Sequence, residues 1–238
     1  VTGGLGFIGS HTVVELQQAG HEVVIVDNCS NADTDVLLGI EKITNTRPDF
    51  ENVDIRNTSE LASKMFKYEN IDAVVHFAAK KSVGESESNP LTYYDNNVNG
   101  TLSLLKFIKD WNIPRVVFSS SCTVYGLPNT LPVSEQEPIK TAGSVYGHTK
   151  QVCEQMLTNF MKEHECGVMV LRYFNPVGAH PSANIGEIPT KISAPYYPCG
   201  FAGQNIVTAD GKMAFVDIDG IKHIYKKALP SKIYKAYH

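Results

Sequence analysis

A tyrosine and a lysine four residues apart, Tyr146 and Lys150 in the stretch Tyr-Gly-His-Thr-Lys, have the types and spacing needed for proton transfer. Residues i and i+4 share one face of a helix, so the phenol and the ammonium can lie side by side. A phenol with its ordinary pKa of about 10 is a poor base at neutral pH, and a neighbouring cation lowers that pKa by favouring the phenolate. A surface tyrosine beside a solvated lysine gives the same spacing, so the pair alone does not decide the chemistry.

A cluster of hydroxyl groups, Ser119-Ser-Ser-Cys-Thr, stands at the end of the predicted strand that runs to Ser121. A serine there can hydrogen-bond a hydroxyl that is being oxidised and relay its proton to Tyr146. Such a cluster can instead satisfy only loop backbone, and its combination with the tyrosine and lysine gives it weight. We expect structural roles for Cys122, beside which no activating base is evident, and for His148, which falls on another helix face than Tyr146.

Three glycines, Gly3, Gly6 and Gly9, stand between the end of a predicted strand and the start of a predicted helix. They permit a tight turn, close approach to a pyrophosphate and close helix packing, and the helix N-terminus attracts phosphate. A glycine-rich turn alone is weak support. However, Asp27 ends the next predicted strand about 20 residues further on, where a carboxylate accepts a hydrogen bond from the ribose 2′-hydroxyl. Because that carboxylate repels a 2′-phosphate, the pattern predicts NAD rather than NADP.

Two later strand ends are candidates for the same cofactor. Asp54 and Ile55 follow a short predicted strand and are placed to meet the adenine. Small residues in Phe77-Ala-Ala-Lys-Lys81 follow the next strand, where they let backbone approach the cofactor. Each stretch alone is more often an ordinary loop, and their position at successive strand ends is what makes them candidates.

Apolar runs alternate with helical patterns along the first 175 residues. The runs are β-branched and continuous, which is typical of strands covered on both faces. This alternation predicts an α/β fold, a doubly wound parallel Rossmann sheet with ligands at the carboxyl ends of its strands. The predicted strands are residues 21–27, 71–77, 114–121 and 167–174, and the predicted helices are residues 6–19, 58–68, 90–111 and 146–164.

The alternation stops after about Asn175, and we place a domain boundary there. Residues 1–175 are expected to form the NAD-binding Rossmann domain, and residues 176–238 a small, truncated or divergent C-terminal substrate-binding segment. That segment has proline-rich stretches at residues 188–189 and 194–198 and short apolar runs at residues 205–208 and 213–218.

Composition and charge exclude several classes of protein. With 42% hydrophobic and 19% charged residues the chain is typical of globular proteins, and its net charge of −4 gives no indication of nucleic acid or an anionic membrane as partner. Five scattered cysteines without a C-x-x-C pair argue against a disulfide framework or a metal site and predict a reducing, cytoplasmic compartment. No apolar run approaches the roughly 20 residues that span a bilayer. Because the chain starts at Val1, we expect the natural N-terminus and most of the first strand to precede it.

Together these motifs resemble the extended short-chain dehydrogenase/reductase family, and within it the UDP-glucose (UDP-galactose) 4-epimerases. The resemblance covers most of residues 1–182 and implies NAD as cofactor and a UDP-hexose as substrate. The matching stretches are VTGGLGFIGSHTVVEL, HFAAKKSVGESESNPLTYYDNNVNGTLSLL, VVFSSSCTVYG, YGHTK and LRYFNPVGAHPS, of which the last three together are distinctive.

By this resemblance Ser121, Tyr146 and Lys150 are catalytic. Tyr146 would take the C4 hydroxyl proton while hydride passes to NAD, and the 4-keto sugar would turn before hydride returns to its opposite face. The nucleotide-sugar would contact Asn175 as well as Ser121, Thr123 and Tyr146. Besides the glycines and the catalytic residues, the implied NAD contacts are Phe7, Ile8, Asp27, Asn28, Cys29, Ser30, Asn31, Ala32, Asp54, Ile55, Phe77, Ala78, Ala79, Lys80, Lys81, Asn96 and Phe174.

The chain also departs from the family pattern. Sugar dehydratases of the family need an acid and a base just after the serine, and Cys122 and Thr123 stand there, which disfavours dehydration. Two stretches of the family's substrate domain, Ile-Pro-Asn-Asn-Leu and Gly-Val-Arg-Asp-Tyr, are not readable. Ile188-Pro-Thr-Lys-Ile-Ser replaces the first, and residues 213–220 are only a faint match to the family residues just after the second. No arginine follows Arg172 to hold the UDP diphosphate.

Two alternatives therefore stay open. One is another nucleotide-sugar epimerase, or a dehydrogenase with the same three residues, which would release NADH. The other is an NAD-binding protein without turnover, because its substrate domain is incomplete. We also expect a homodimer through the helices of residues 90–111 and 146–164, although packing against the sheet explains the same apolar stripes.

Overall fold

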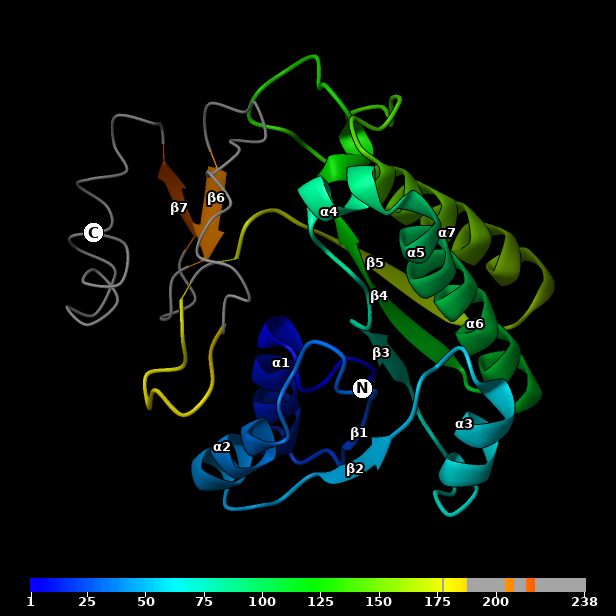
Figure 1. Ribbon diagram of the computed structural model, residues 1–238, viewed down its shortest axis with the longest axis vertical. Coiled ribbons are helices and arrows are strands. Elements are labelled where there is room, and N and C mark those ends of the chain that lie inside the picture. The colour runs from blue at the N-terminus through cyan, green and yellow to red at the C-terminus, as the bar shows by residue number, and fades with distance from the viewer. Residues whose placement is uncertain (177, 188–203, 208–212, 217–238) are drawn as a thin grey trace.

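The computed structural model describes residues 1–176, 178–187, 204–207 and 213–216, in which a parallel sheet lies between two layers of helices (Figure 1). The order of elements alternates strand and helix as expected. In chain order they are α1 (Phe7–Gln18), β1 (Val24–Asp27), α2 (Asp35–Thr44), β2 (Asp49–Asn52), α3 (Thr58–Met65), β3 (Val74–His76), α4 (Val83–Ser88), α5 (Pro90–Tyr93), a π-helical segment η1 (Tyr94–Asn99), α6 (Gly100–Asp110), β4 (Arg115–Ser121), a 3-10 turn η2 (Cys122–Tyr125), α7 (Val145–Glu163), β5 (Gly167–Tyr173), β6 (Gln204–Val207) and β7 (Met213–Val216).

The first three residues act as the central strand of the sheet. Thr2 forms parallel bridges to Val26 of β1 and to His76 of β3, and its backbone N–H donates to the Val75 carbonyl at 2.9 Å. With β1–β2 on one side and β3–β4–β5 on the other, the strands in chain order stand as 3-2-1-4-5-6. This is the order of the dinucleotide-binding Rossmann fold, whose ligand site lies where the order reverses. The predicted fold class is confirmed.

Two cores cover the two faces of the sheet, as neighbouring residues of β1 show. Ile25 packs with Val13 and Val14 of α1 and with residues of α2, whereas Val26 packs into the core under α3, α6 and α7. Successive residues of a strand point to opposite faces, and both faces of this sheet are covered by helices, so both side chains are buried. Continuous apolar runs such as Val23–Val26 therefore reflect burial on both faces.

Strand β5 is the exception to that expectation. It is the last strand on its side of the described sheet, and Met169 and Val170 are 59% and 36% exposed. The apolar sequence of β5 resembles that of the inner strands, so the sequence did not predict that this strand is exposed on one side.

The helices differ from the sequence expectation mainly in their internal detail. The helix expected over residues 90–111 comprises α5, η1 and α6, and its middle is wound as a π-helix. The expected helix over residues 58–68 ends at Met65, and α2 and α4 were not expected. In the part of the chain that the structure describes, no helix is long and apolar enough to cross a bilayer.

The residues just after the expected domain boundary pack against the Rossmann domain. Ile185 is 5% exposed within the core formed by α1 and α2, and a Cβ on Gly39 of α2 would lie 2.3 Å from the Asn184 carbonyl oxygen. Further on, β6 and β7 pair antiparallel and overlap the two predicted apolar runs. The proline-rich stretches and the altered Ile188-Pro-Thr-Lys-Ile-Ser motif lie outside the described residues.

Candidate active site

The glycine turn lies at the point where the strand order reverses. Gly3 has a φ of +67°, which favours glycine, and a Cβ there would lie 2.6 Å from the Ala78 backbone nitrogen at the end of β3. A Cβ on Gly9 would lie 2.1 Å from the Gly3 carbonyl oxygen, so α1 can approach the sheet only with glycine at that position. Both predicted reasons for glycine, the tight turn and the close helix packing, are confirmed.

Helix α1 presents a bare N-terminus to this turn. Its N-cap residue is Gly6, which has no side chain to accept from the first turn, and that turn contains no acidic residue. The first backbone N–H groups of a helix have no intrahelical acceptor, and they carry the positive end of the helix dipole. Phe7 and Ile8 lie in this turn, which therefore suits an anionic group.

Asp27 is held at the end of β1 by backbone N–H groups. Its carboxylate accepts from Leu5 N at 3.2 Å and from Cys29 N at 3.0 Å, which orients it beside the glycine turn. Burial raises the pKa of Asp27, and the two hydrogen bonds oppose that rise. The chain turns at Cys29, whose φ of 54° is left-handed, and Ser30 N donates to Asn28 Oδ1 at 3.1 Å.

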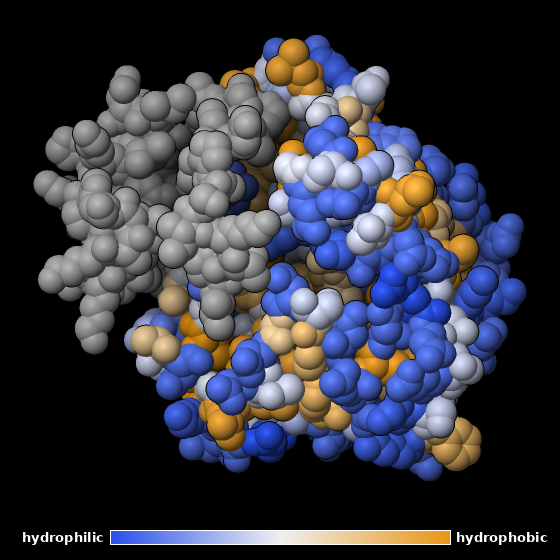
Figure 2. All heavy atoms as spheres, viewed as in Figure 1, coloured by the Kyte–Doolittle hydropathy of each residue, from blue (hydrophilic) through white to orange (hydrophobic). Residues whose placement is uncertain are grey.

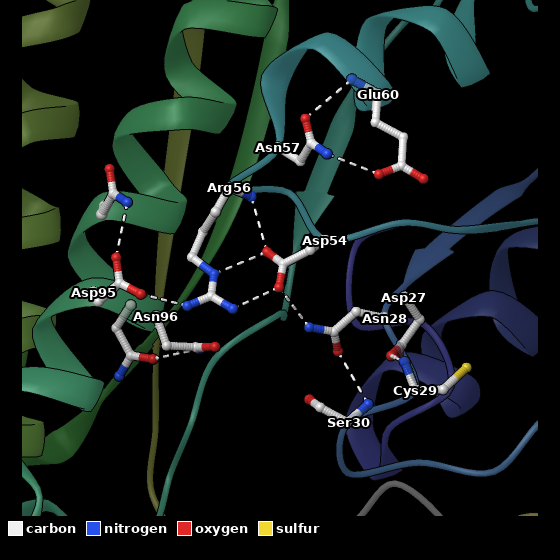
Figure 3. Close-up of polar contacts among 12 residues, drawn as sticks. Asp27, Asn28, Cys29, Ser30, Asp54, Arg56, Asn57, Glu60, Asp95 and Asn96 are labelled. Carbon is white, nitrogen blue, oxygen red and sulfur yellow. Dashed lines mark hydrogen bonds and ion pairs between the residues drawn. The ribbon is translucent and has the colours of Figure 1, made fainter.

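Asp54, in the loop after β2, faces the loop after β1 (Figure 3). Its carboxylate accepts hydrogen bonds from Asn28 Nδ2 at 2.9 Å and from the Arg56 guanidinium. The guanidinium holds the pKa of Asp54 well below its usual range. Asn28 and Asp54, predicted separately as cofactor contacts, are therefore brought together, while Ile55 is buried in the core.

Asn97, which the sequence analysis did not single out, holds the end of β3 in place. Its Oδ1 accepts from Lys80 N at 2.8 Å, and its Nδ2 donates to Lys80 O at 3.0 Å and to Thr149 Oγ1 at 3.1 Å. The predicted neighbour, Asn96, donates to Asn97 Oδ1 at 3.0 Å. Asn97 is 2% exposed and joins the stretch after β3 to α7 at the residue before Lys150. Asn96 and Asn97 are adjacent and of the same type, so the sequence does not indicate which of them is buried.

Ser121 ends β4 at the carboxyl edge of the sheet and caps the 3-10 turn η2. Its Oγ accepts from Thr123 N at 3.2 Å and from Thr123 Oγ1 at 2.9 Å. A hydroxyl has two acceptor sites and one donor hydrogen, so these bonds leave the Ser121 O–H to donate. The geometry therefore suits a serine that donates to a substrate oxygen, whereas the expected proton relay requires a Thr123 bond to break.

Tyr146 and Lys150 lie in the first turns of α7. Ser144 caps the helix by accepting from Gly147 N at 3.0 Å, and Tyr146 N donates to Ser86 Oγ of α4 at 3.1 Å. Lys150 Nζ lies 5.9 Å from the centre of the Tyr146 ring and 4.9 Å from that of Phe118. The helical spacing thus brings phenol and ammonium together as predicted.

Lys150 is buried beneath this site. It is 3% exposed, and its Nζ donates to the Ser119 carbonyl oxygen at 2.7 Å. Burial lowers the pKa of Lys150 to about 8. The ammonium therefore remains the main form at pH 7, next to the strand that ends at Ser121.

A partly buried ion pair ties together the elements that carry these three residues. Glu154, one turn beyond Lys150 on α7, accepts from Arg172 Nε at 3.0 Å and from Arg172 Nη2 at 2.8 Å. Ser120 of β4 donates to the same carboxylate, and Arg172 Nη1 donates to the Tyr125 hydroxyl at 3.0 Å. The sequence analysis missed this network, since its members are scattered over four elements.

The remaining candidates lie at the edges of the site. Phe174 packs against the core of Cys122, Val124 and Tyr125, and Asn175 is exposed at the end of β5. His148 is exposed on the other side of α7, where its Nδ1 lies 2.7 Å from the Tyr94 hydroxyl oxygen. In the described residues no group of three or more acidic, histidine or cysteine side chains has metal-binding geometry.

The fold and site define a dinucleotide-binding Rossmann protein with a serine, a tyrosine and a lysine at the carboxyl edge of its sheet. Residues 1–219 match the NAD dependent epimerase/dehydratase family. The chain belongs to that family.

Two similar proteins are both UDP-glucose 4-epimerases by name. The chain is 46% identical over 221 residues to UDP-glucose 4-epimerase of Dictyostelium discoideum, covering 92% of this chain and 62% of that protein. It is 45% identical over 193 residues to UDP-glucose 4-epimerase of Bacillus subtilis, covering 81% of this chain and 56% of that protein. The chain thus spans about three fifths of the length of these relatives.

Solved structures give the same family. UDP-glucose 4-epimerase from Stenotrophomonas maltophila, with bound NAD and formylated UDP-arabinopyranose, is 49% identical with a TM-score of 0.76, over 79% of this chain and 56% of that one. The enzyme from Bifidobacterium longum, in complex with NAD+ and UDP, is 33% identical with a TM-score of 0.84, over 95% of this chain and 81% of that one.

Proposed function

We propose that this protein binds NAD and interconverts UDP-galactose and UDP-glucose by inverting the configuration at C4 of the hexose. The observation that carries the proposal is that Lys150 lies beside Tyr146 and bonds the strand that ends at Ser121, at the sheet edge that also holds the glycine turn. The named relatives and the two structures with NAD support it.

The residues present fit NAD. A Cβ would fill the space at Gly3, and the bare N-terminus of α1 suits the pyrophosphate. Asp27 lies where the adenosine ribose would sit, and its carboxylate would accept from a 2′-hydroxyl and repel a 2′-phosphate. Arg56, on the neighbouring loop, is engaged by Asp54 and Asp95, so its charge is not free for a 2′-phosphate.

Each catalytic side chain has a role in the proposed reaction. Ser121 donates a hydrogen bond to the sugar O4 and orients it, and Tyr146 accepts the O4 proton as general base and later returns it. Lys150 Nζ lies 5.9 Å from the centre of the Tyr146 ring, and its positive charge favours the phenolate form of that tyrosine. When bound, NAD supplies the hydride acceptor and donor, and it ends the cycle unchanged.

We further propose that residues 1–175 form the cofactor domain and that the following residues contribute to the nucleotide-sugar site through Asn175. The packing of residues 178–187 on α1 and α2 brings that segment back to the cofactor domain. Lys81, a predicted cofactor contact, pairs with Glu187 there.

A cytoplasmic location and a homodimer complete the proposal. The described cysteines Cys29, Cys122, Cys153 and Cys166 form no disulfide, which is the state that thiols keep in a reducing compartment. Leu91 of α5 and Leu102 of α6 are 81% and 42% exposed, and both helices belong to the segment expected to contact a second copy of the chain. The face of the molecule in Figure 2 is mainly hydrophilic, with separate hydrophobic patches. Sedimentation that shows only monomer at micromolar concentration would exclude the dimer.

The test is conversion of UDP-galactose by the purified protein, with Tyr146→Phe and Tyr68→Phe compared. Both substitutions remove one hydroxyl, and the Tyr68 hydroxyl donates to Glu51 at 2.8 Å, away from the site. We expect conversion without net NADH, lost in Tyr146→Phe by at least about a hundredfold and retained in Tyr68→Phe. Net NADH would indicate the dehydrogenase alternative, and bound NAD without conversion would indicate the alternative without turnover.

A further inference from the structure

One guanidinium, that of Arg56, lies between two carboxylates at the edge of the sheet (Figure 3). Its Nε and Nη2 donate to the two oxygens of Asp54 at 2.9 and 2.6 Å, the paired geometry that makes arginine–carboxylate bonds strong. Its Nη1 reaches Asp95 in the π-helical segment η1. Arg56 N also donates to Asp54 Oδ1 at 2.9 Å, so backbone and side chain act on the same carboxylate.

These bonds join three segments that are far apart in the sequence. Asp54 also accepts from Asn28 in the loop after β1, and Asp95 also accepts from Asn99 at 2.9 Å within η1. The loop after β1, the loop after β2 and η1 are therefore linked through one side chain. Each of the three contains a predicted cofactor contact: Asn28, Asp54 and Asn96.

Close packing beneath the guanidinium supports the same link. A Cβ on Gly100, where η1 passes into α6, would lie 3.3 Å from Ile55 Cδ1 and 3.8 Å from Arg56 Cγ. A larger residue there would require the Ile55 side chain to shift. The π-helical winding is itself a local distortion of a kind often found at functional sites, and here it carries Asp95.

We propose that Arg56 is a positioning residue for the adenosine end of the NAD site, holding the Asp54 carboxylate and η1 in the arrangement that the adenine and its ribose require. The inference rests on the proposed NAD binding. Arg56 acts through Asp54 and Asp95 and is not itself a catalytic residue. Its side chain is 33% exposed, so solvent weakens the link and its effect on binding is moderate.

The experiment measures the affinity of the purified protein for NAD and for ADP by calorimetry. ADP contains the adenosine end and lacks the nicotinamide, so it reports on the part of the site that Arg56 serves. The variants are Arg56→Met, which removes the cation, and Arg56→Lys, which keeps the charge but lacks the paired N–H donors of the guanidinium. The matched control is Arg47→Met, whose guanidinium pairs with the exposed Glu41 at 3.1 Å.

We expect Arg56→Met to weaken the binding of NAD and of ADP by the same factor, about tenfold, which is about 1.4 kcal/mol, because solvent screens the bonds of this partly exposed side chain. Arg56→Lys should recover part of that loss, and Arg47→Met should bind both ligands as the unchanged protein does. A purely structural role would lower the melting temperature of Arg56→Met while leaving both affinities of the folded protein intact.

Unchanged ADP affinity in folded Arg56→Met would overturn the proposal, as would equal losses in Arg47→Met. If Arg56→Met does not fold, Arg56→Lys decides: ADP affinity equal to that of the unchanged protein overturns the proposal. Failure of the unchanged protein to bind NAD would instead refute the proposed function itself, and this inference with it.

Discussion

Replacing Lys150 by methionine should stabilise the protein at neutral pH while removing its activity. Lys150 is 3% exposed, and burial lowers its pKa from 10.5 to about 8. At about 1.4 kcal/mol for each pKa unit, holding the charged form inside costs about 3 kcal/mol below pH 8. Methionine has a similar length and no charge. It forfeits the hydrogen bond to the Ser119 carbonyl, worth about 1 kcal/mol, which leaves a net gain of about 2 kcal/mol.

The pH dependence identifies the cause. Between pH 8 and 10.5 the unfolded chain binds more protons at Lys150 than the folded chain, so the free energy of unfolding rises with pH across that interval. Lys150→Met lacks this rise, and its advantage over the unchanged protein should therefore fall by about 3 kcal/mol from pH 7 to pH 10.5.

Urea unfolding at a series of pH values measures this difference. Lys106→Met, on the exposed face of α6, is the control and should show no comparable change with pH. A Lys150→Met protein that is less stable than the unchanged protein at pH 7, or whose stability difference is constant with pH, would refute the reasoning.

Three further substitutions test other parts of the structure. Gly9→Ala would put a Cβ 2.1 Å from the Gly3 carbonyl oxygen and should destabilise the protein by about 3 kcal/mol and abolish NAD binding, as calorimetry and thermal melting can check. Arg172→Met would leave Glu154, with a side chain 9% exposed, without its cation; we expect a loss of about 3 kcal/mol in urea unfolding, and a loss below 1 kcal/mol would contradict the buried pair. Asn97→Ala would free the Lys80 backbone and should cost about 2 kcal/mol and raise the NAD dissociation constant; unchanged binding would count against its clamping role.

The sheet and the site could be predicted because each depends on a local pattern. Ile25 and Val26 are adjacent apolar residues that face opposite cores, and a continuous apolar run is the direct sequence signature of that burial. Tyr146 and Lys150 share a helix face, and Gly3 and Gly9 stand where no side chain fits. Residue type and spacing were sufficient for these features.

The features that could not be predicted depend on contacts between distant segments. Gly39 weakens the helical pattern of α2, and the reason for it, the Asn184 carbonyl 2.3 Å from where its Cβ would be, lies 145 residues away. The π-helical winding of η1 leaves no mark in the apolar pattern, and the burial of Asn97 rather than Asn96 depends on Lys80 and Thr149. The roles of Arg56 and of the Arg172–Glu154 pair depend on partners from several elements in the same way.

The most direct test of the proposed chemistry follows the hydrogen at C4. The protein is incubated with UDP-galactose that carries deuterium at C4, and the product is analysed by NMR and mass spectrometry. If Tyr146 moves only the hydroxyl proton while the C4 hydrogen leaves and returns as hydride, UDP-glucose forms with deuterium retained at C4. Absence of UDP-glucose, or product whose C4 deuterium has exchanged with water, would contradict the proposed function.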